Sequence, residues 1–145
     1  MSPFVIFLEG TKMGNASVNG LDVYYEIHGS GEPLVLLHGG VGASEMFGAL
    51  LPALASERKV IAVHLQGHGR TKDIDRPLRF EQLADDVAAL IRHLGLGKAA
   101  LVGYSLGGAV ALRTAIQHPE AASRLVVISE PCKHDGWVPR GEGRL

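Results

Sequence analysis

Short apolar runs without polar alternation stand out along the chain, at residues 34–37, 60–63 and 125–128. Each run is too short for a helix, and runs of this kind are typical of strands buried on both faces of a parallel sheet. A fourth run, at residues 99–102, has the same character. Residues 21–27 alternate more visibly between apolar and polar side chains, which predicts a half-exposed strand nearer an edge of the sheet.

Helical patterns lie between these runs. Apolar residues recur at spacings of three and four over residues 80–94, with Asp85 and Asp86 on the opposite face, which predicts a surface helix. The glycines within residues 95–97 suit a left-handed cap that would end it. Residues 106–117 predict a second helix, which the following His-Pro pair ends. Because strand and helix alternate, the sequence predicts an α/β fold, a mostly parallel sheet flanked by helices.

Composition and charge exclude several classes of protein. The chain has 145 residues, of which 46% are apolar and 20% charged, and this is typical of one globular domain. Its formal charge of −1 gives no attraction to phosphate backbones or anionic lipid, so neither nucleic acid nor a membrane is expected as a partner. The single cysteine, Cys132, cannot form an internal disulfide, which predicts a cytoplasmic protein. No Cys/His group has the spacing of a zinc site, so no metal is expected.

The chain is predicted to have three parts. Residues 1–15 form a poorly specified N-terminal extension, whose apolar stretch is too short to span a bilayer. Residues 16–130 hold the predicted strands and helices and therefore form the core. Residues 131–145 have no apolar period, which predicts a loop or a frayed tail.

The motif G-Y-S-L-G-G at residues 103–108 is the strongest chemical signal in the chain. It follows the apolar run at 99–102 directly and opens the second predicted helix, which is the context required by a nucleophile elbow. In such an elbow Ser105 occupies a strained turn that exposes its hydroxyl, while Gly103 and Gly107 leave room where strand and helix crowd together. The plainer interpretation is a glycine-rich turn with an ordinary serine at the helix cap.

A second motif, H-G-G-V-G at residues 38–42, comes directly after the apolar run at 34–37. Acyl transfer requires two N–H donors for the developing oxyanion, commonly one after the nucleophile and one from a neighbouring loop. The backbone N–H groups of Leu106 and Gly40 are therefore the predicted oxyanion hole. The alternative is a flexible loop whose glycines serve only its backbone conformation.

A third motif, L-Q-G-H-G-R-T, stands at residues 65–71. On these three motifs, residues 16–139 resemble the N-terminal half of the α/β-hydrolase fold superfamily, particularly its esterase, lipase and bromoperoxidase-like members. The resemblance implies that Ser105 is the nucleophile of a serine hydrolase that cleaves carboxylic esters without a metal or organic cofactor. It implies a short-chain ester as substrate, because the segment that forms a lid in the family is missing. His68 is then a turn residue rather than the general base, and His38 orients its loop.

The family supplies its acid and its histidine after later strands, and only one further strand is visible after Ser105. By this resemblance the usual acid and base are absent, and the truncated α/β-hydrolase fold ends after about the sixth strand. One hypothesis is that Glu130 serves as the acid and His134 as the base, since both follow that strand. The alternative is that both are solvated loop residues.

Three further alternatives stay open at this stage. Truncation would leave an apolar sheet edge uncovered, so self-association is expected, and a partner could donate the missing histidine. The chain could also be a noncatalytic binding or interaction module in which Ser105 is a relic of the fold. The glycine motif also resembles the loop of proline iminopeptidases, although Val41 stands where those peptidases have proline.

Overall fold

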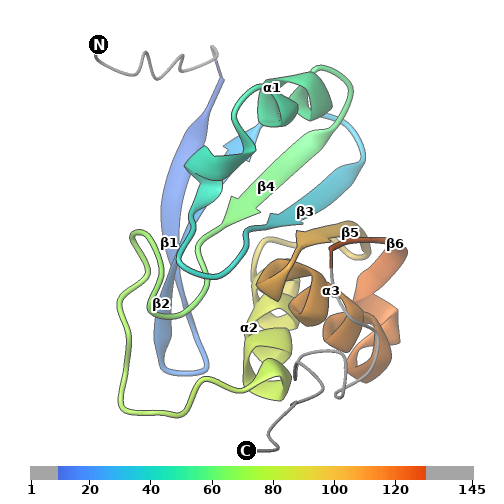
Figure 1. The fold of residues 1–145 in the computed structure, drawn as a ribbon. Coiled ribbons are helices and arrows are strands. Elements are labelled where there is room, and N and C mark those ends of the chain that lie inside the picture. Colours follow the sequence, from blue (N-terminus) through green and yellow to red (C-terminus); the bar gives the residue numbers. More distant parts are fainter. Residues whose placement is uncertain (1–9, 130–145) are drawn as a thin grey trace, which may run out of the picture.

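The computed structural model describes residues 10–129, which form one six-stranded sheet in the order β1-β2-β4-β3-β5-β6 (Figure 1). Strands β4, β3, β5 and β6 run parallel to one another, whereas β2 is antiparallel to both β1 and β4. The predicted mostly parallel α/β fold is therefore confirmed. The strands are β1 (Lys12–Val18), β2 (Leu21–His28), β3 (Pro33–Leu37), β4 (Lys59–Val63), β5 (Ala99–Tyr104) and β6 (Ala122–Ile128).

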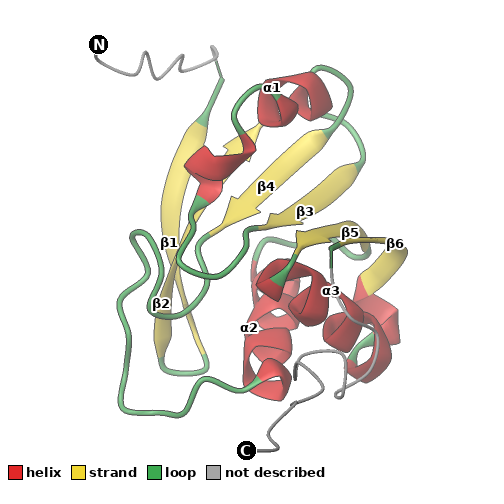
Figure 2. Ribbon diagram, in the orientation of Figure 1, coloured by secondary structure: helices red, strands yellow, loops and turns green. Residues whose placement is uncertain are grey.

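Helices cover both faces of this sheet (Figure 2). Leu34 and Leu36 of β3 pack with the cluster that contains Leu51 of α1, on one face. Val35 and Leu37 pack with the cluster that contains the buried residues of α2 and α3, on the other face. Burial on two faces explains the continuous apolar run. The helical elements are η1 (Ser44–Phe47), α1 (Leu50–Ala55), α2 (Phe80–His93), α3 (Leu106–Gln117) and η2 (Pro119–Ala121).

Strand β1 was not predicted from the sequence. It pairs with β2 along its whole length and begins at Lys12, ahead of the predicted core boundary at residue 16. The signal for this hairpin is the pair Asn19 and Gly20, whose φ angles of 52° and 77° are those that a tight two-residue turn requires. The predicted half-exposed strand, β2, lies second from that edge of the sheet.

Two predictions of burial are wrong. The run at 125–128 was expected to be buried on both faces, but its four residues are 36% to 49% exposed, because β6 is an edge strand of the described sheet. Asp86 was expected on the solvent side of α2, but it is buried, since Arg76 forms an ion pair with its carboxylate and Asn19 donates a hydrogen bond to it. The exposed edge at β6 is where the predicted self-association would occur, and that association stays a prediction.

Candidate active site

Ser105 lies at the junction of β5 and α3 with φ 51° and ψ −115°, in the left-handed region that a non-glycine residue seldom adopts. Two backbone hydrogen bonds hold this conformation. The Ser105 N–H donates to the Ile128 carbonyl at 2.9 Å, and the Ala109 N–H donates to the Ser105 carbonyl at 3.0 Å. The side chain is partly buried, and within residues 10–129 its hydroxyl has no hydrogen-bond partner. The strained turn therefore presents a free hydroxyl at the carboxyl end of the sheet.

The glycines on either side of Ser105 leave no room for a side chain. A Cβ atom on Gly103 would lie 2.0 Å from the Gly107 carbonyl oxygen. A Cβ atom on Gly107 would lie 2.2 Å from the carbonyl oxygen of Leu37, at the end of β3. Strand, helix and the β3 loop thus touch backbone to backbone around the serine, as the motif predicts.

Gly40 lies beside Leu106 in this arrangement. Strands β3 and β5 are parallel neighbours with Leu37 opposite Gly103, so the two loops that follow them meet at one edge of the sheet. A Cβ atom on Gly40 would lie 4.0 Å from Leu106 Cβ, which is ordinary van der Waals contact. The structure therefore brings together the three predicted residues Ser105, Gly40 and Leu106. The predicted acid Glu130 and base His134 lie outside the described residues.

His38 fixes the peptide that precedes Gly40. Its Nδ1–H donates to the Gly39 carbonyl at 2.7 Å, and its Nε2 accepts the Leu65 N–H at 3.0 Å. The Gly39 carbonyl also accepts the Gly42 N–H at 3.1 Å. Because C=O and N–H point in opposite directions across a trans peptide, the Gly40 N–H points away from the His38 ring. His38 thus has the loop-orienting role that the sequence predicts.

Burial lowers the pKa of His38 from 6.5 to about 4, although its hydrogen bond to the Gly39 carbonyl opposes this change. Burial also lowers the pKa of His64, which lies 6.1 Å from His38 between ring centroids. Both rings are fully buried, and each uses one nitrogen to accept a backbone N–H. They are therefore neutral structural groups at neutral pH.

These neutral histidines predict that acid destabilises the fold. Between pH 6.5 and about 4 the unfolded chain binds a proton at residue 38 that the folded chain does not bind, so the stability falls as the pH falls. The loss for His38 reaches at most about 3 kcal/mol across this range. Urea denaturation at several pH values measures it. His38→Asn should flatten part of the slope, and His93→Asn, on the exposed end of α2, is the matched control. If the free energy of unfolding of His38→Asn depends on pH as steeply as that of wild type, His38 is not the neutral buried group described here.

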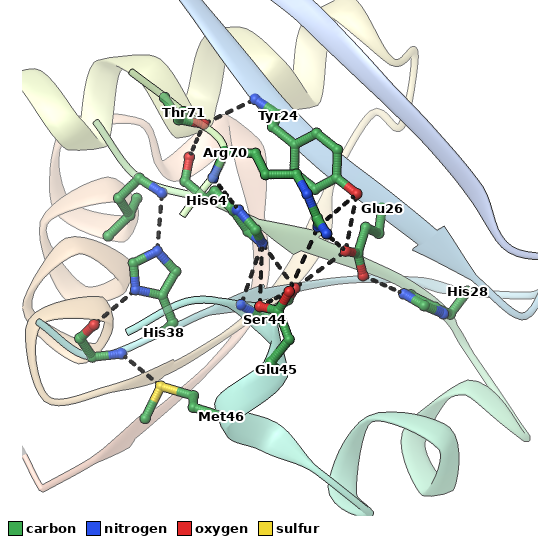
Figure 3. Close-up of polar contacts among 12 residues, drawn as sticks. Tyr24, Glu26, His28, His38, Ser44, Glu45, Met46, His64, Arg70 and Thr71 are labelled. Atoms are coloured by element: carbon green, nitrogen blue, oxygen red, sulfur yellow. Dashed lines mark hydrogen bonds and ion pairs between the residues drawn. The ribbon is translucent and has the colours of Figure 1, made fainter. Parts of the chain in front are cut away.

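A cluster of polar residues, Glu26, Ser44, Glu45, His64 and Arg70, lies near the glycine loop (Figure 3). His64 Nδ1 accepts the Arg70 N–H at 2.9 Å, and His64 Nε2 lies 2.8 Å from Ser44 Oγ and 3.3 Å from the Ser44 backbone nitrogen. The Ser44 hydroxyl is 3.3 Å from the Glu26 carboxylate, and His28 Nε2 is 2.8 Å from the same carboxylate. Burial alone would raise the pKa of Glu26, but hydrogen bonds from His28 and Tyr24 lower it below its usual value. Glu26 is therefore an ionised, well-partnered group.

The same cluster contains the only set of potential metal ligands found within residues 10–129. Glu26, Glu45 and His64 offer ligand atoms that lie within 4.8 Å of one another. The Arg70 guanidinium, however, lies 3.6 Å from the Glu26 carboxylate and 3.5 Å from the Glu45 carboxylate. Arg70 therefore already balances the negative charge that a cation would use.

This cluster was not predicted from the sequence. One signal was available, because His64 follows β4 directly, at the same edge of the sheet as His38 after β3. His68, in contrast, behaves as predicted: its N–H donates to the Leu65 carbonyl within a turn, and its ring contacts Gln66 and His38 rather than Ser105. Among the described helices none is long and apolar enough to cross a membrane.

Comparison with known proteins identifies the arrangement. A model of the alpha/beta hydrolase fold matches residues 32–138. The chain is 39% identical over 123 residues to the dihydrolipoyllysine-residue acetyltransferase component of the acetoin cleaving system of Pseudomonas putida, across 83% of this chain and 33% of that protein. It is 37% identical over 116 residues to the soluble epoxide hydrolase of Corynebacterium sp. (strain C12), across 78% of this chain and 40% of that protein.

Solved structures agree with the sequence comparison. The fold is similar to that of a thermophilic esterase from Thermogutta terrifontis, with a TM-score of 0.77 and 29% identity, across 84% of this chain and 47% of that chain. The chain spans only 33% and 40% of the length of the two curated relatives.

Proposed function

Because this chain belongs to the alpha/beta hydrolase fold family, we propose that it carries the nucleophile and oxyanion hole of a serine hydrolase that cleaves carboxylic esters. Ser105 is the nucleophile, and the N–H groups of Gly40 and Leu106 form the oxyanion hole. One observation carries the proposal: Ser105, whose hydroxyl has no hydrogen-bond partner within residues 10–129, sits on a strained turn next to the loop that holds Gly40.

The reaction would follow from this geometry in two stages. The Ser105 oxygen attacks the ester carbonyl carbon while a base takes its proton, and the carbonyl oxygen becomes an oxyanion. The two N–H donors stabilise that charge where it develops, and the N-terminus of α3 adds a favourable dipole. The alcohol leaves, and water then hydrolyses the acyl-serine intermediate.

The proposal places the base outside the described histidines. Within residues 10–129 no histidine hydrogen-bonds to the Ser105 hydroxyl, and His38 and His64 use their ring nitrogens on other partners. The sequence hypothesis assigns this role to His134 with Glu130 as its acid. Because His134→Ala would remove the general base, it should slow ester hydrolysis at Ser105 by at least about 10³-fold.

The apolar residues around Ser105 support an ester substrate whose acyl group is short and uncharged. Three exposed large apolar residues lie near Gly39 and Ser105 in the chain: Val41 on the loop after β3, Met46 on η1 and Tyr104 at the end of β5. Similarity to the Thermogutta terrifontis esterase supports ester chemistry in the same fold. These apolar side chains favour contact with an acyl chain over contact with a charged group, which would lose hydration beside them.

Turnover of p-nitrophenyl esters tests the proposal. The purified chain should hydrolyse the acetate and lose rate as the acyl chain lengthens, and a fluorophosphonate should label it. Absence of both hydrolysis and labelling would favour the noncatalytic binding module. Hydrolysis of a prolyl p-nitroanilide in preference to the ester would favour a peptidase. Labelling without turnover would mean that the acyl-serine intermediate forms but its hydrolysis stalls.

A further inference from the structure

The thioether of Met46 is bonded to the loop that carries Gly40. The Gly39 N–H donates to Met46 Sδ at 3.2 Å, as the dashed line to the sulfur atom in Figure 3 shows. The Gly39 carbonyl accepts from His38 Nδ1 and from the Gly42 N–H. Both peptide groups of Gly39 are therefore fixed, one by the sulfur and the other by the imidazole.

The sulfur atom fills the concave side of this loop. A Cβ atom on Gly42 would lie 3.0 Å from Met46 Sδ, which is closer than ordinary contact. A Cβ atom on Gly39 would lie 3.6 Å from the Met46 methyl carbon. The glycine loop therefore packs around the Met46 side chain, which leaves no room for a larger side chain at Gly42 on the side that faces the sulfur.

The element that carries Met46 is itself anchored to the sheet. Met46 lies on η1, and its N–H donates to the Ala43 carbonyl at 3.1 Å. The first residue of η1, Ser44, is buried and bonded to His64 at the end of β4. The contact between Ser44 and His64 therefore anchors η1 to the sheet, and η1 in turn positions the Met46 sulfur atom.

We propose that Met46 is a positioning residue for the Gly39–Gly40 segment and a site at which a peroxide disables it. Its catalytic consequence rests on the proposed function, whereas its effect on Gly39 does not. The Met46 residue as a whole is 44% exposed, so a small oxidant can reach its side chain from solvent. Leucine at this position keeps the volume but has no acceptor, and it should release the Gly39 N–H.

Oxidation of Met46 changes the same contact. The sulfur lone pair attacks one oxygen of hydrogen peroxide, an S–O bond forms as the O–O bond breaks, and the second oxygen leaves as water. The sulfur is oxidised to the sulfoxide and the peroxide is reduced. An oxygen atom on the lone pair that faces Gly39 would not fit within the 3.2 Å between Gly39 N and Met46 Sδ, so oxidation on that side displaces the glycine loop.

The chain supplies a matched control for this experiment. Met13 is 49% exposed and lies on β1, where it pairs with Glu26 across the β1–β2 hairpin and not with the glycine loop. The variants are M46L, with M13L as the control, each compared with wild type by its melting curve. The Gly39 amide is followed by ¹H–¹⁵N spectroscopy and hydrogen exchange. Its exchange should quicken about fivefold in M46L and stay unchanged in M13L. An unchanged Gly39 amide in M46L overturns the proposal.

Fluorophosphonate labelling of Ser105 provides the second readout. M46L should be labelled about three- to tenfold more slowly than wild type, whereas M13L should match wild type. Peroxide should slow the labelling of M13L and leave that of M46L unchanged. If wild type is not labelled at all, the proposed function fails, and the Gly39 amide still decides whether Met46 positions the loop. If wild type and M46L are labelled equally fast, the catalytic consequence of Met46 is wrong.

Discussion

Replacing Ser105 by alanine is expected to abolish labelling of the chain by a fluorophosphonate and to reduce ester hydrolysis by at least about 10³-fold. The probe reacts only with a nucleophile that a base activates, and alanine has no oxygen to attack phosphorus. The fold should survive, because the Ser105 hydroxyl has no hydrogen-bond partner within residues 10–129 and so contributes no bond there.

Mass spectrometry of the labelled protein and a second serine variant make this result specific. Ser56→Ala is the matched control, because Ser56 lies at the end of α1 and its hydroxyl bonds only to the nearby Ala53 carbonyl. It should be labelled like wild type. An adduct on Ser44 would contradict the account, since Ser44 is the described serine that is bonded to a histidine, at 2.8 Å from His64. Burial of Ser44 is the reason to expect no adduct there.

Replacing Gly107 by alanine is expected to destabilise the whole fold, by about 3 kcal/mol or more. The added Cβ would lie 2.2 Å from the Leu37 carbonyl oxygen and 2.5 Å from that of His38, and both belong to backbone that cannot yield locally. Helix α3 would have to move away from β3, although alanine is otherwise the better helix former. Denaturation in guanidinium chloride, followed by circular dichroism, measures the loss.

Gly40→Ala is the matched control for stability. Its Cβ would meet only Leu106 atoms at 4.0 Å, so the free energy of unfolding should change by less than about 0.5 kcal/mol. Wild-type stability in Gly107→Ala would show that the helix and the strand are not in backbone contact at this point. Equal losses in the two variants would mean that the whole loop, rather than one contact, is sensitive to added volume.

The parts of the site that depend on local chain geometry were predictable from the sequence. Around Ser105, the order of buried strand, glycine, serine and helix leaves only a sharp turn, so residues 103–108 predict both the strain and the crowding. The pairing of Gly40 with Leu106 was predicted from the two glycine motifs and from the need of acyl transfer for two N–H donors, whereas the order of strands that places them side by side is a matter of topology. Apolar runs located β3, β4 and β5 because those strands are buried on two faces.

Features that depend on partners distant in sequence were not predictable. The position of Asp86 in α2 predicts that it lies on the polar face of the helix. Its burial is explained by its contacts with Arg76 and Asn19, which are distant in sequence. Glu26 and His64 meet because β2 runs antiparallel to β4, which no local pattern indicates. Strand β1 was missed because the hairpin turn at Asn19 was not recognised as one.

A crystal structure of the chain after reaction with a fluorophosphonate tests the central claim most directly. The account predicts phosphorus bonded to Ser105 Oγ, with the phosphoryl oxygen about 2.7–3.1 Å from both the Gly40 and the Leu106 backbone nitrogens. A phosphoryl oxygen directed away from either nitrogen, or bound by side chains instead, would contradict it.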